Sequence, residues 1–472
     1  MLERLRHRLP EFALGAILLF FSFRELGTFP SPWNDDSLFM IVAKELAAGH
    51  GYVLPVLDEG WRYPFILNVG PQVIVPAAIM IKLFGYAASI ARLPSVVILI
   101  LTSLVSYLYT KKTVGRNAAR WATALLVTLS AFINTGKPVL GEVPGFLFLL
   151  LGLYVLHGAD RTQREHTFLR LPRSIAVGLL FGIAVMTKLT YGLIYPAIGA
   201  AFLAAACRRD WRETRDTAVM GIAAAAAFLP WRLLESAHRA GFSGELGQYA
   251  VGWDALPYLN VIRAKPELLL RLPFLAFGLL FVLGGAGLWL RRRTFTPTEH
   301  AIILTLVALF MVYFLNGFGW YRHLLPAHLL LLPFVPDGAG VLLKRKLAAA
   351  LLGAVVLAQF FYQLDHRGAG TVTVTGESAD ILERDFRGTE LVVQEPAIFV
   401  ELPENPRWTF LSTELEARRY GEFENLPLAQ EEHCLPVVRQ TPANRAGIYG
   451  EERLTKLAGS YYLIGPPASC SR

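Results

Sequence analysis

Carboxylates that could accept a proton stand at unusual positions in this 472-residue chain. Two adjacent acids, Asp35 and Asp36, lie in the stretch WNDDSLF, directly after the first long apolar run. A further acid, Glu142, begins a later apolar run in LGEVPGF. A charge at the edge of an apolar run is costly unless it faces water, a partner or a site, and a carboxylate can deprotonate a hydroxyl group. These acids are therefore candidates for a deprotonation step.

Basic and imidazole side chains that could hold an anion lie in other short polar segments. They are Arg62 in GWRYPF, Lys188 in VMTKLTYG, His238 in PWRLLESAH and Arg322 in GFGWYRHLLPA. Together with the acids they favour a site that binds an anionic headgroup beside a proton acceptor. Simpler explanations stay open, namely helix capping for Asp35 or Asp36, a solvated boundary for Glu142, and snorkelling to lipid headgroups for the cations.

The elements that must position these residues are predicted to be membrane helices. The chain is 54% hydrophobic and only 17% charged, its mean hydropathy is +0.43, and apolar runs repeat from near residue 11 to residue 364. This composition predicts a polytopic all-α membrane protein. The net charge of +8 comes from Lys and Arg clusters between the runs, which membrane topology explains better than a nucleic-acid partner does. The sequence contains no Walker loop, dinucleotide fingerprint or metal-binding cysteine pair.

The basic clusters set the number of crossings, because Lys and Arg in short loops are retained on the cytoplasmic side. About eleven transmembrane helices place every cluster on one side. They are predicted near 11–27, 89–110, 118–134, 139–157, 174–188, 190–206, 217–234, 268–290, 299–316, 322–341 and 347–364. If the apolar stretch 70–85 also crossed, every later basic loop would lie outside, so we predict that it is an interfacial helix. The N-terminus is then expected in the cytoplasm.

The predicted topology divides the chain into two domains. Residues 1–364 form a membrane domain, whose first outer loop, 28–88, carries interfacial helices and opens with Asp35 and Asp36. Residues 365–472 are polar, mix strand-like with helical stretches, and predict a small soluble α/β domain on the outer side, in the periplasm or outside the cell.

The cysteines are consistent with this division but leave their chemistry open. Cys434 and Cys470 fall in the C-terminal domain, whereas Cys207 falls in a cytoplasmic loop. A disulfide between Cys434 and Cys470 and two buried free thiols are both compatible with the sequence.

The order of several segments resembles the polytopic GT-C glycosyltransferases that use polyprenyl-phosphate sugars, especially the bacterial relatives of protein O-mannosyltransferases and the lipid A aminoarabinose transferase. The resemblance spans about residues 11–341 and rests on WNDDSLFMIVAKELAAGHGYVLP, KLFGYAASIARLPSVVILILTSLVSYLY, LGEVPGFLFLLLGLYVL, GLLFGIAVMTKLTYGLIYPAIGA, LPW and YRHLLPAHLLLLPF. It implies an enzyme of the inner (plasma) membrane that moves a hexosyl or pentosyl group, with inversion, from a polyprenyl-phosphate donor. The implied acceptor is a hydroxyl group of a glycolipid, polysaccharide or protein.

The resemblance also implies a role for each candidate residue. Asp35 matches the catalytic base and Glu142 the supporting acid. Asp36 stands where the family often has Glu, and would orient the acceptor or support a metal ion. The residues implied to bind the donor phosphate are Lys188, Arg322 and Arg62, although Arg62 replaces a family lysine. His238 stands where related enzymes can place a metal-binding histidine, so a divalent metal ion is an optional cofactor.

Two other classes of protein remain alternatives. A non-enzymatic translocase of lipid-linked sugars would also use interfacial helices and outer cations, but it predicts ionisable groups along a path through the membrane. Here the charged groups gather at one membrane face. A scaffold of envelope assembly would bind its partner through the C-terminal domain, and deletion of residues 365–472 would then abolish partner binding.

Overall fold

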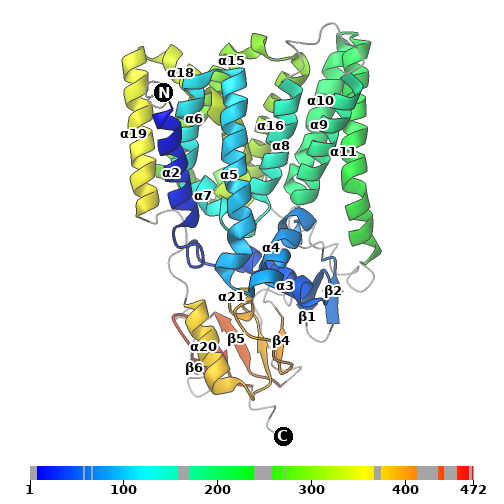
Figure 1. Ribbon diagram of the computed structural model, residues 1–472, viewed down its shortest axis with the longest axis vertical. Coiled ribbons are helices and arrows are strands. Elements are labelled where there is room, and N and C mark those ends of the chain that lie inside the picture. Colours follow the sequence, from blue (N-terminus) through cyan, green and yellow to red (C-terminus); the bar gives the residue numbers. More distant parts are fainter. Residues whose placement is uncertain are drawn as a thin grey trace.

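The computed structural model describes residues 8–56, 59–64, 67–157, 170–238, 258–270, 272–365, 374–411, 434–440, 454–466 and 470. These residues form a helical bundle with a small sheet domain below one end (Figure 1). The N-terminus lies at the opposite end of the bundle from the sheet domain. The fold class predicted from the sequence, a polytopic membrane protein with a small α/β domain, is confirmed.

The bundle consists of apolar helices that run between its two ends. They are α2 (Leu9–Phe23), α5 (Ala88–Thr113), α6 (Arg116–Thr128), α7 (Ser130–Gly136), α8 (Glu142–His157), α9 (Arg170–Thr187), α10 (Ile194–Cys207), α11 (Trp211–Ala237), α15 (Leu272–Leu290), α16 (Pro297–Asn316), α17 (Tyr321–Leu331), α18 (Val335–Leu342) and α19 (Arg345–Leu364). Short elements connect them, namely α13 (Asn260–Ala264), α14 (Glu267–Leu270) and the 3-10 helices η3 (Leu189–Leu193), η4 (Arg292–Thr294) and η5 (Leu332–Phe334). Within the described residues, six helical stretches are long and apolar enough to cross a membrane. Each of the eleven predicted spans overlaps one to three consecutive helices.

In its described residues, the predicted first outer loop folds into two helices and a hairpin. Helix α3 (Asn34–Ala48) ends at Gly49, whose positive φ of 96° suits glycine. Strands β1 (Val53–Val56) and β2 (Glu59–Arg62) pair antiparallel, and α4 (Pro71–Phe84) follows. Figure 1 shows α3 and α4 gathered at the bundle end nearest the sheet domain, where interfacial helices were expected.

The described residues of the C-terminal domain form a mixed five-stranded sheet with two helices. Its elements are α20 (Thr375–Phe386), β3 (Leu391–Val393), α21 (Pro396–Phe399), β4 (Trp408–Phe410), β5 (Val437–Gln440), β6 (Leu454–Lys456) and β7 (Tyr461–Ile464). The strand order is β4-β3-β5-β7-β6, in which β3 is parallel to β4 and β5, and β7 is antiparallel to β5 and β6. A disulfide joins Cys434 to Cys470, and Cys207 is a free, exposed thiol at the end of α10.

The sheet domain packs directly on the helix that carries the acidic pair. Helix α21 contacts α3, and Val400 and Phe410 belong to the same buried apolar cluster as Phe39 and Ile41 of α3. Lys44 of α3 adds polar contacts with the sheet domain. Its Nζ donates hydrogen bonds to the carbonyl oxygens of Leu402 at 2.6 Å and Val400 at 3.3 Å. The position of α3 therefore depends on both domains.

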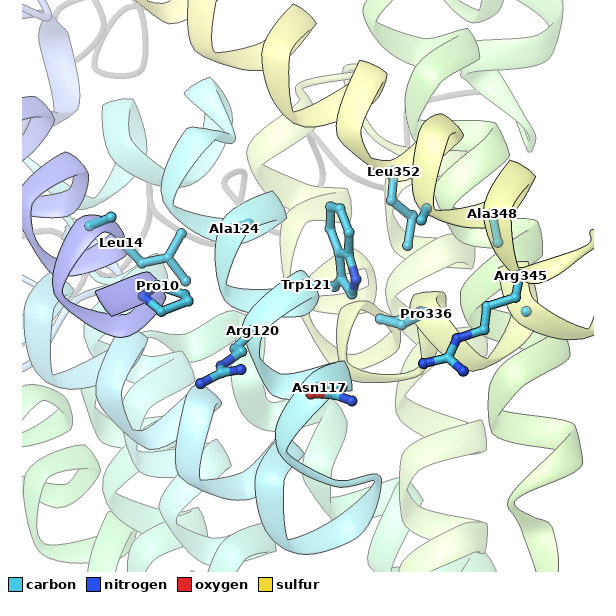
Figure 2. Close-up of a pocket in the computed structure, with 13 residues that line it drawn as sticks. Pro10, Leu14, Asn117, Arg120, Trp121, Ala124, Pro336, Arg345, Ala348 and Leu352 are labelled. Carbon is cyan, nitrogen blue, oxygen red and sulfur yellow. The ribbon is translucent and has the colours of Figure 1, made fainter. Parts of the chain in front are cut away.

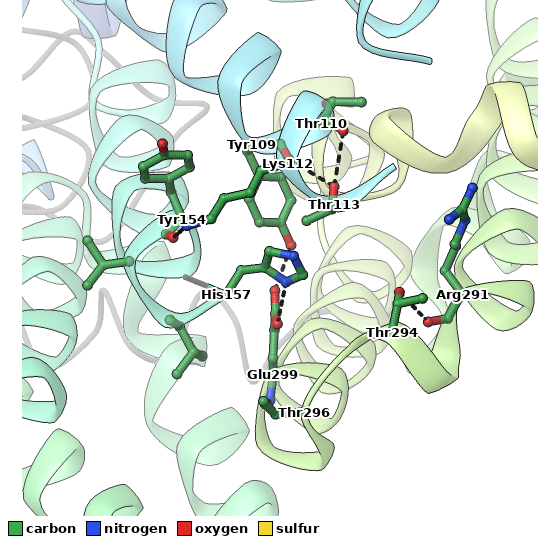
Figure 3. A network of polar contacts seen from close by, with 12 residues as sticks. Tyr109, Thr110, Lys112, Thr113, Tyr154, His157, Arg291, Thr294, Thr296 and Glu299 are labelled. Atoms are coloured by element: carbon green, nitrogen blue, oxygen red, sulfur yellow. Dashed lines mark hydrogen bonds and ion pairs between the residues drawn. The ribbon is translucent and has the colours of Figure 1, made fainter. Parts of the chain in front are cut away.

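A buried polar network joins three helices at the other end of the bundle (Figure 3). The carboxylate of Glu299 on α16 accepts a hydrogen bond from the Tyr109 hydroxyl at 3.1 Å and lies 3.0 Å from Nδ1 of His157. All three side chains are buried, and they come from α16, α5 and α8. Since each group has a partner, the network stabilises the bundle without exposing charge to lipid.

A buried lysine between α7 and α8 makes stability depend on pH. Burial, together with nearby Arg92, lowers the pKa of Lys137 from 10.5 to about 7, and its Nζ donates a hydrogen bond to the Arg24 carbonyl at 2.6 Å. Between these two pH values the unfolded chain binds more protons than the folded protein, so stability rises with pH.

The Lys137→Met variant is expected to lack this rise. From pH 7 to pH 9 the wild type should gain about 2–3 kcal/mol relative to the variant, because one pKa unit corresponds to about 1.4 kcal/mol. Melting temperatures of the two purified proteins, compared in one detergent across this pH range, measure the difference. Parallel pH profiles would show that Lys137 does not titrate there.

Candidate active site

Asp35 and Arg322 form an ion pair at the bundle end that faces the sheet domain. Asp35 lies in the first turn of α3 and Arg322 is the second residue of α17. Their side chains are 30% and 11% exposed, and Oδ2 of Asp35 lies 2.6 Å from Nη1 of Arg322. The guanidinium also lies 4.3 Å from the ring centre of Trp33 and 4.5 Å from that of Trp320. Two aromatic faces therefore fix the position of this cation.

Glu142 links the same arginine to a lysine. Its Oε1 lies 3.6 Å from Nζ of Lys188 and 4.0 Å from Nε of Arg322. The Glu142 side chain is 4% exposed, and within the described part of the chain its Oε2 has no hydrogen-bond partner. Glu142 thus holds two cations near each other and keeps one buried oxygen available.

Backbone contacts bring Lys188 to Glu142. Lys188 precedes η3 and forms a β-bridge with Val69 of the first outer loop. Gly141, just before α8, permits the close approach, because a Cβ at this position would lie 2.8 Å from the carbonyl oxygen of Thr187. These four side chains, Asp35, Glu142, Lys188 and Arg322, are called the acid–cation cluster below.

Asp36 has a different environment from its neighbour, and this corrects the sequence-based expectation. Its side chain is fully buried, with Oδ2 2.5 Å from Nη2 of Arg92 and Oδ1 accepting the Val139 N–H at 2.6 Å. Arg92 also donates to the carbonyl oxygens of Leu26 and Pro30. Both carboxylate oxygens of Asp36 are therefore used inside the protein, which contradicts a contact with the acceptor or a metal ion. Asp36 instead fixes α3 against α5.

Arg62 and His238 lie in a second region, around the β1–β2 hairpin. Arg62 is exposed at the end of β2, and among the described residues it makes no ion pair with the acid–cation cluster. The His238 ring lies 4.8 Å from the ring of Tyr63, and its Nδ1 is 2.9 Å from the Leu234 carbonyl oxygen.

These surroundings of His238 do not fit a metal ion. In the described ranges no group of three or more His, Cys, Asp or Glu side chains could hold one. We therefore derive no metal-dependent step.

A cavity of about 660 Å³ adjoins the acid–cation cluster and lies between the two domains. From the bundle it is lined by Trp33, Trp320 and Arg322, and from the sheet domain by Glu395 and Gln440. Oε1 of Glu395 accepts the Gln440 N–H at 2.9 Å, and burial raises the pKa of Glu395. The cavity thus brings polar groups of both domains next to Arg322.

Three residues that build the site were not predicted from the sequence. Trp33 lies two residues before Asp35, and Trp320 lies two residues before Arg322. Their stacking on Arg322 depends on how α3 and α17 meet, which the sequence does not show. Arg92 gave a usable signal, since it is an isolated charge at the start of an apolar run, where a charged side chain needs a partner.

Similarity to known proteins agrees with this geometry. Residues 69–233 match the family model described as dolichyl-phosphate-mannose-protein mannosyltransferase. ArnT from Cupriavidus metallidurans, in a crystal structure bound to undecaprenyl phosphate, superposes with a TM-score of 0.64 over 97% of this chain and 98% of that chain, at 14% identity. The chain has the GT-C fold. No curated protein is similar enough in sequence to match.

Two more GT-C structures superpose on most of the chain. The oligosaccharyltransferase of Archaeoglobus fulgidus gives a TM-score of 0.62 at 13% identity, covering 92% of this chain and 70% of that chain. The arabinofuranosyltransferase AftD from Mycobacteria gives 0.53 at 12% identity, covering 92% and 35%. The GT-C fold implied by the resemblance is confirmed, and the family match over residues 69–233 agrees with the predicted glycosyltransferase class. The family match contains Glu142 and Lys188, whereas Asp35 and Arg322 lie outside it.

Proposed function

We propose that this GT-C protein transfers a sugar from a polyprenyl-phosphate donor to an acceptor hydroxyl group, with inversion and with Asp35 as general base. The observation that carries the proposal is the acid–cation cluster, in which a partly exposed carboxylate lies 2.6 Å from a cation that also adjoins a second, buried acid. The cluster supports this reaction because sugar transfer from a lipid phosphate needs both a proton acceptor and cations for the phosphate. A bound sugar would separate Asp35 from Arg322, so that the two act on opposite faces of its anomeric carbon.

The donor phosphate is assigned to Arg322 and Lys188. Both cations face Glu142, and the buried carboxylate keeps them near each other before the phosphate arrives. When the bond from the anomeric carbon to the phosphate oxygen breaks, negative charge grows on the leaving polyprenyl phosphate. Arg322 and Lys188, which Glu142 already holds near each other, stabilise that charge once the bound sugar has opened the Asp35–Arg322 pair. We assign no role in the reaction to Arg62, because it lies outside the acid–cation cluster.

Asp35 is assigned the proton of the acceptor. The acceptor oxygen attacks the anomeric carbon, its proton passes to the Asp35 carboxylate, and the phosphate leaves from the opposite face of the sugar, which inverts the configuration. Asp35 is suited to this role because it is 30% exposed, whereas Asp36 is fully buried and paired. The cavity between the domains, next to Arg322, is the proposed place for the acceptor, with Glu395 and Gln440 as contacts.

The positions of the basic clusters and of the disulfide support an orientation of the protein in its membrane. The basic clusters lie toward the end of the bundle that carries the N-terminus, and the disulfide lies in the sheet domain at the other end. We place the N-terminus in the cytoplasm and the C-terminal domain on the outer side of the plasma membrane. Two fold relatives support a lipid-phosphate donor, since ArnT is bound to undecaprenyl phosphate and the archaeal oligosaccharyltransferase to dolichol-phosphate.

Cleavage of the donor by the purified protein tests this function. A panel of polyprenyl-phosphate hexoses and pentoses is incubated with the protein and an envelope glycolipid extract, and released polyprenyl phosphate is measured by chromatography. We expect one donor to be cleaved, and Glu142→Gln to lower the rate by about 10²-fold through misplaced cations. Glu267→Gln is the control, because Glu267 is exposed on α14. A donor that crosses vesicle membranes without cleavage would instead indicate a translocase.

A further inference from the structure

The bundle contains a second cavity, of about 570 Å³ (Figure 2). It lies toward the bundle end that carries the N-terminus, which Figure 1 shows opposite the sheet domain. Helices α2 and α19 both pack against α6. The cavity is lined by residues of these three helices and of α18. Pro10, Gly340, Arg345 and Ala349 line it and are exposed, so the cavity reaches the protein surface. No step of the proposed sugar transfer uses it.

The walls of this second cavity are apolar along most of its length. They are formed mainly by Leu14, Trp121, Ala124, Ala348 and Leu352. The helices that contribute these residues belong to the membrane domain, so an occupant would come from the lipid rather than from water. An acyl chain suits such a trough, because it offers apolar contact without hydrogen bonds to satisfy.

The polar groups of the cavity are concentrated at one end. Figure 2 shows the side-chain nitrogens of Asn117, Arg120 and Arg345 on the same side of the cavity, away from Leu14 and Leu352. Asn117 and Arg120 belong to the first turns of α6, and Arg345 is the first residue of α19. Headgroup and chain contacts are therefore separated along one axis, as they are in a phospholipid.

The charge at this end is positive. Arg116 and Arg120 share one carboxylate, that of Glu11, at 2.9 and 3.0 Å. Arg345 has no ion-pair partner among the described residues, and Lys344 and Lys346 flank it. Neither α6 nor α19 has a side-chain hydrogen bond capping its N-terminus, so both helix ends add free N–H groups and positive potential.

We propose that this cavity is a binding site for a phospholipid of net negative charge. The phosphate lies at Arg345 and Asn117, and one acyl chain lies along α6 between α2 and α19. The site is separate from that of the donor lipid, which we place at the other end of the bundle, and the proposal does not depend on the catalytic assignment.

Native mass spectrometry of the full-length protein tests the site. Detergent-purified protein is titrated with phosphatidylglycerol or with phosphatidylcholine of the same acyl chains, and the bound fraction is counted. We expect at least tenfold tighter binding of the first bound phosphatidylglycerol, and at least fivefold weaker binding in Arg345→Gln. Gly340→Leu fills the cavity, since a Cβ at Gly340 meets no atom within 4 Å, and it should remove this first binding event.

Matched controls keep the test decisive. Gly353→Leu on α19 adds the same side chain where a Cβ also meets nothing within 4 Å, but Gly353 does not line the cavity, so its lipid binding should equal that of the wild type. Glycerol 3-phosphate should not compete at millimolar concentration. Equal binding of the two phospholipids, unchanged binding in both cavity variants, or full competition by glycerol 3-phosphate would each overturn the proposal.

Discussion

Replacing Asp35 with Asn is expected to lower the rate of sugar transfer by about 10²- to 10⁴-fold, because an amide cannot accept the acceptor proton. The change keeps the size of the side chain, and Asp35 is partly exposed with one ion-pair partner, so the fold should persist. Donor binding should also persist, since Arg322 and Lys188 remain. Single-turnover release of polyprenyl phosphate measures the rate, and binding of labelled donor measures the affinity.

The neighbouring acids provide the control for this prediction. Asp36→Asn removes a charge that is fully buried against Arg92 and should destabilise the protein by about 3–5 kcal/mol, because the arginine is left buried and unpaired. Glu45→Gln, at the other end of α3, alters an ion pair with the exposed His50. This variant should change neither the rate of sugar transfer nor the stability of the protein. An Asp35→Asn protein that unfolds like Asp36→Asn, or that keeps its full rate, would refute the assignment of Asp35 as base.

Replacing Arg322 is expected to lower the efficiency with which the protein uses the donor, by a factor similar in size to that predicted for Asp35→Asn. Arg322→Lys keeps the charge and loses both the planar contacts with Trp33 and Trp320 and the reach to two acids. We expect kcat/KM for the donor to fall by about 10²- to 10³-fold, since the phosphate loses a positioned cation.

Two measurements separate this effect from misfolding. Arg263→Lys, an exposed change on α13, should behave as the wild type in both melting temperature and rate. In Arg322→Lys the loss should grow when the donor carries a poorer leaving group, because the cation stabilises the departing phosphate. A loss that is the same for all donors would assign Arg322 to structure instead.

The membrane domain was predictable because its signals are local and strong. Apolar runs, one-sided basic loops and the polar tail are each visible in the sequence, and the helices α2 to α19 follow them. The structure forms helix α4 at the stretch 70–85, and its interfacial position stays a prediction from the charge rule, since an additional crossing there would reverse the side of every later basic loop. The disulfide could not be decided, because two cysteines alone do not report their distance.

The site was predictable only where position in the topology determines it. Glu142 and Lys188 lie at helix ends that the predicted topology assigns to one membrane face, and the structure brings them within 3.6 Å of each other. The separate roles of Asp35 and Asp36 depend on Arg92, which is more than fifty residues away along the chain. The local sequence around the two acids therefore does not indicate which of them is buried. Arg62 and His238 share that membrane face but lie around the hairpin, since topology sets depth and not lateral position.

Comparative mass spectrometry of envelope glycolipids and glycans tests the central claim most directly. Cells that carry the wild-type protein are compared with cells that carry Asp35→Asn at equal protein levels. The account predicts that one glycolipid or glycan loses a single hexose or pentose in the variant, while the corresponding polyprenyl-phosphate sugar accumulates. Identical glycans and unchanged lipid-linked sugars in the two strains would contradict it.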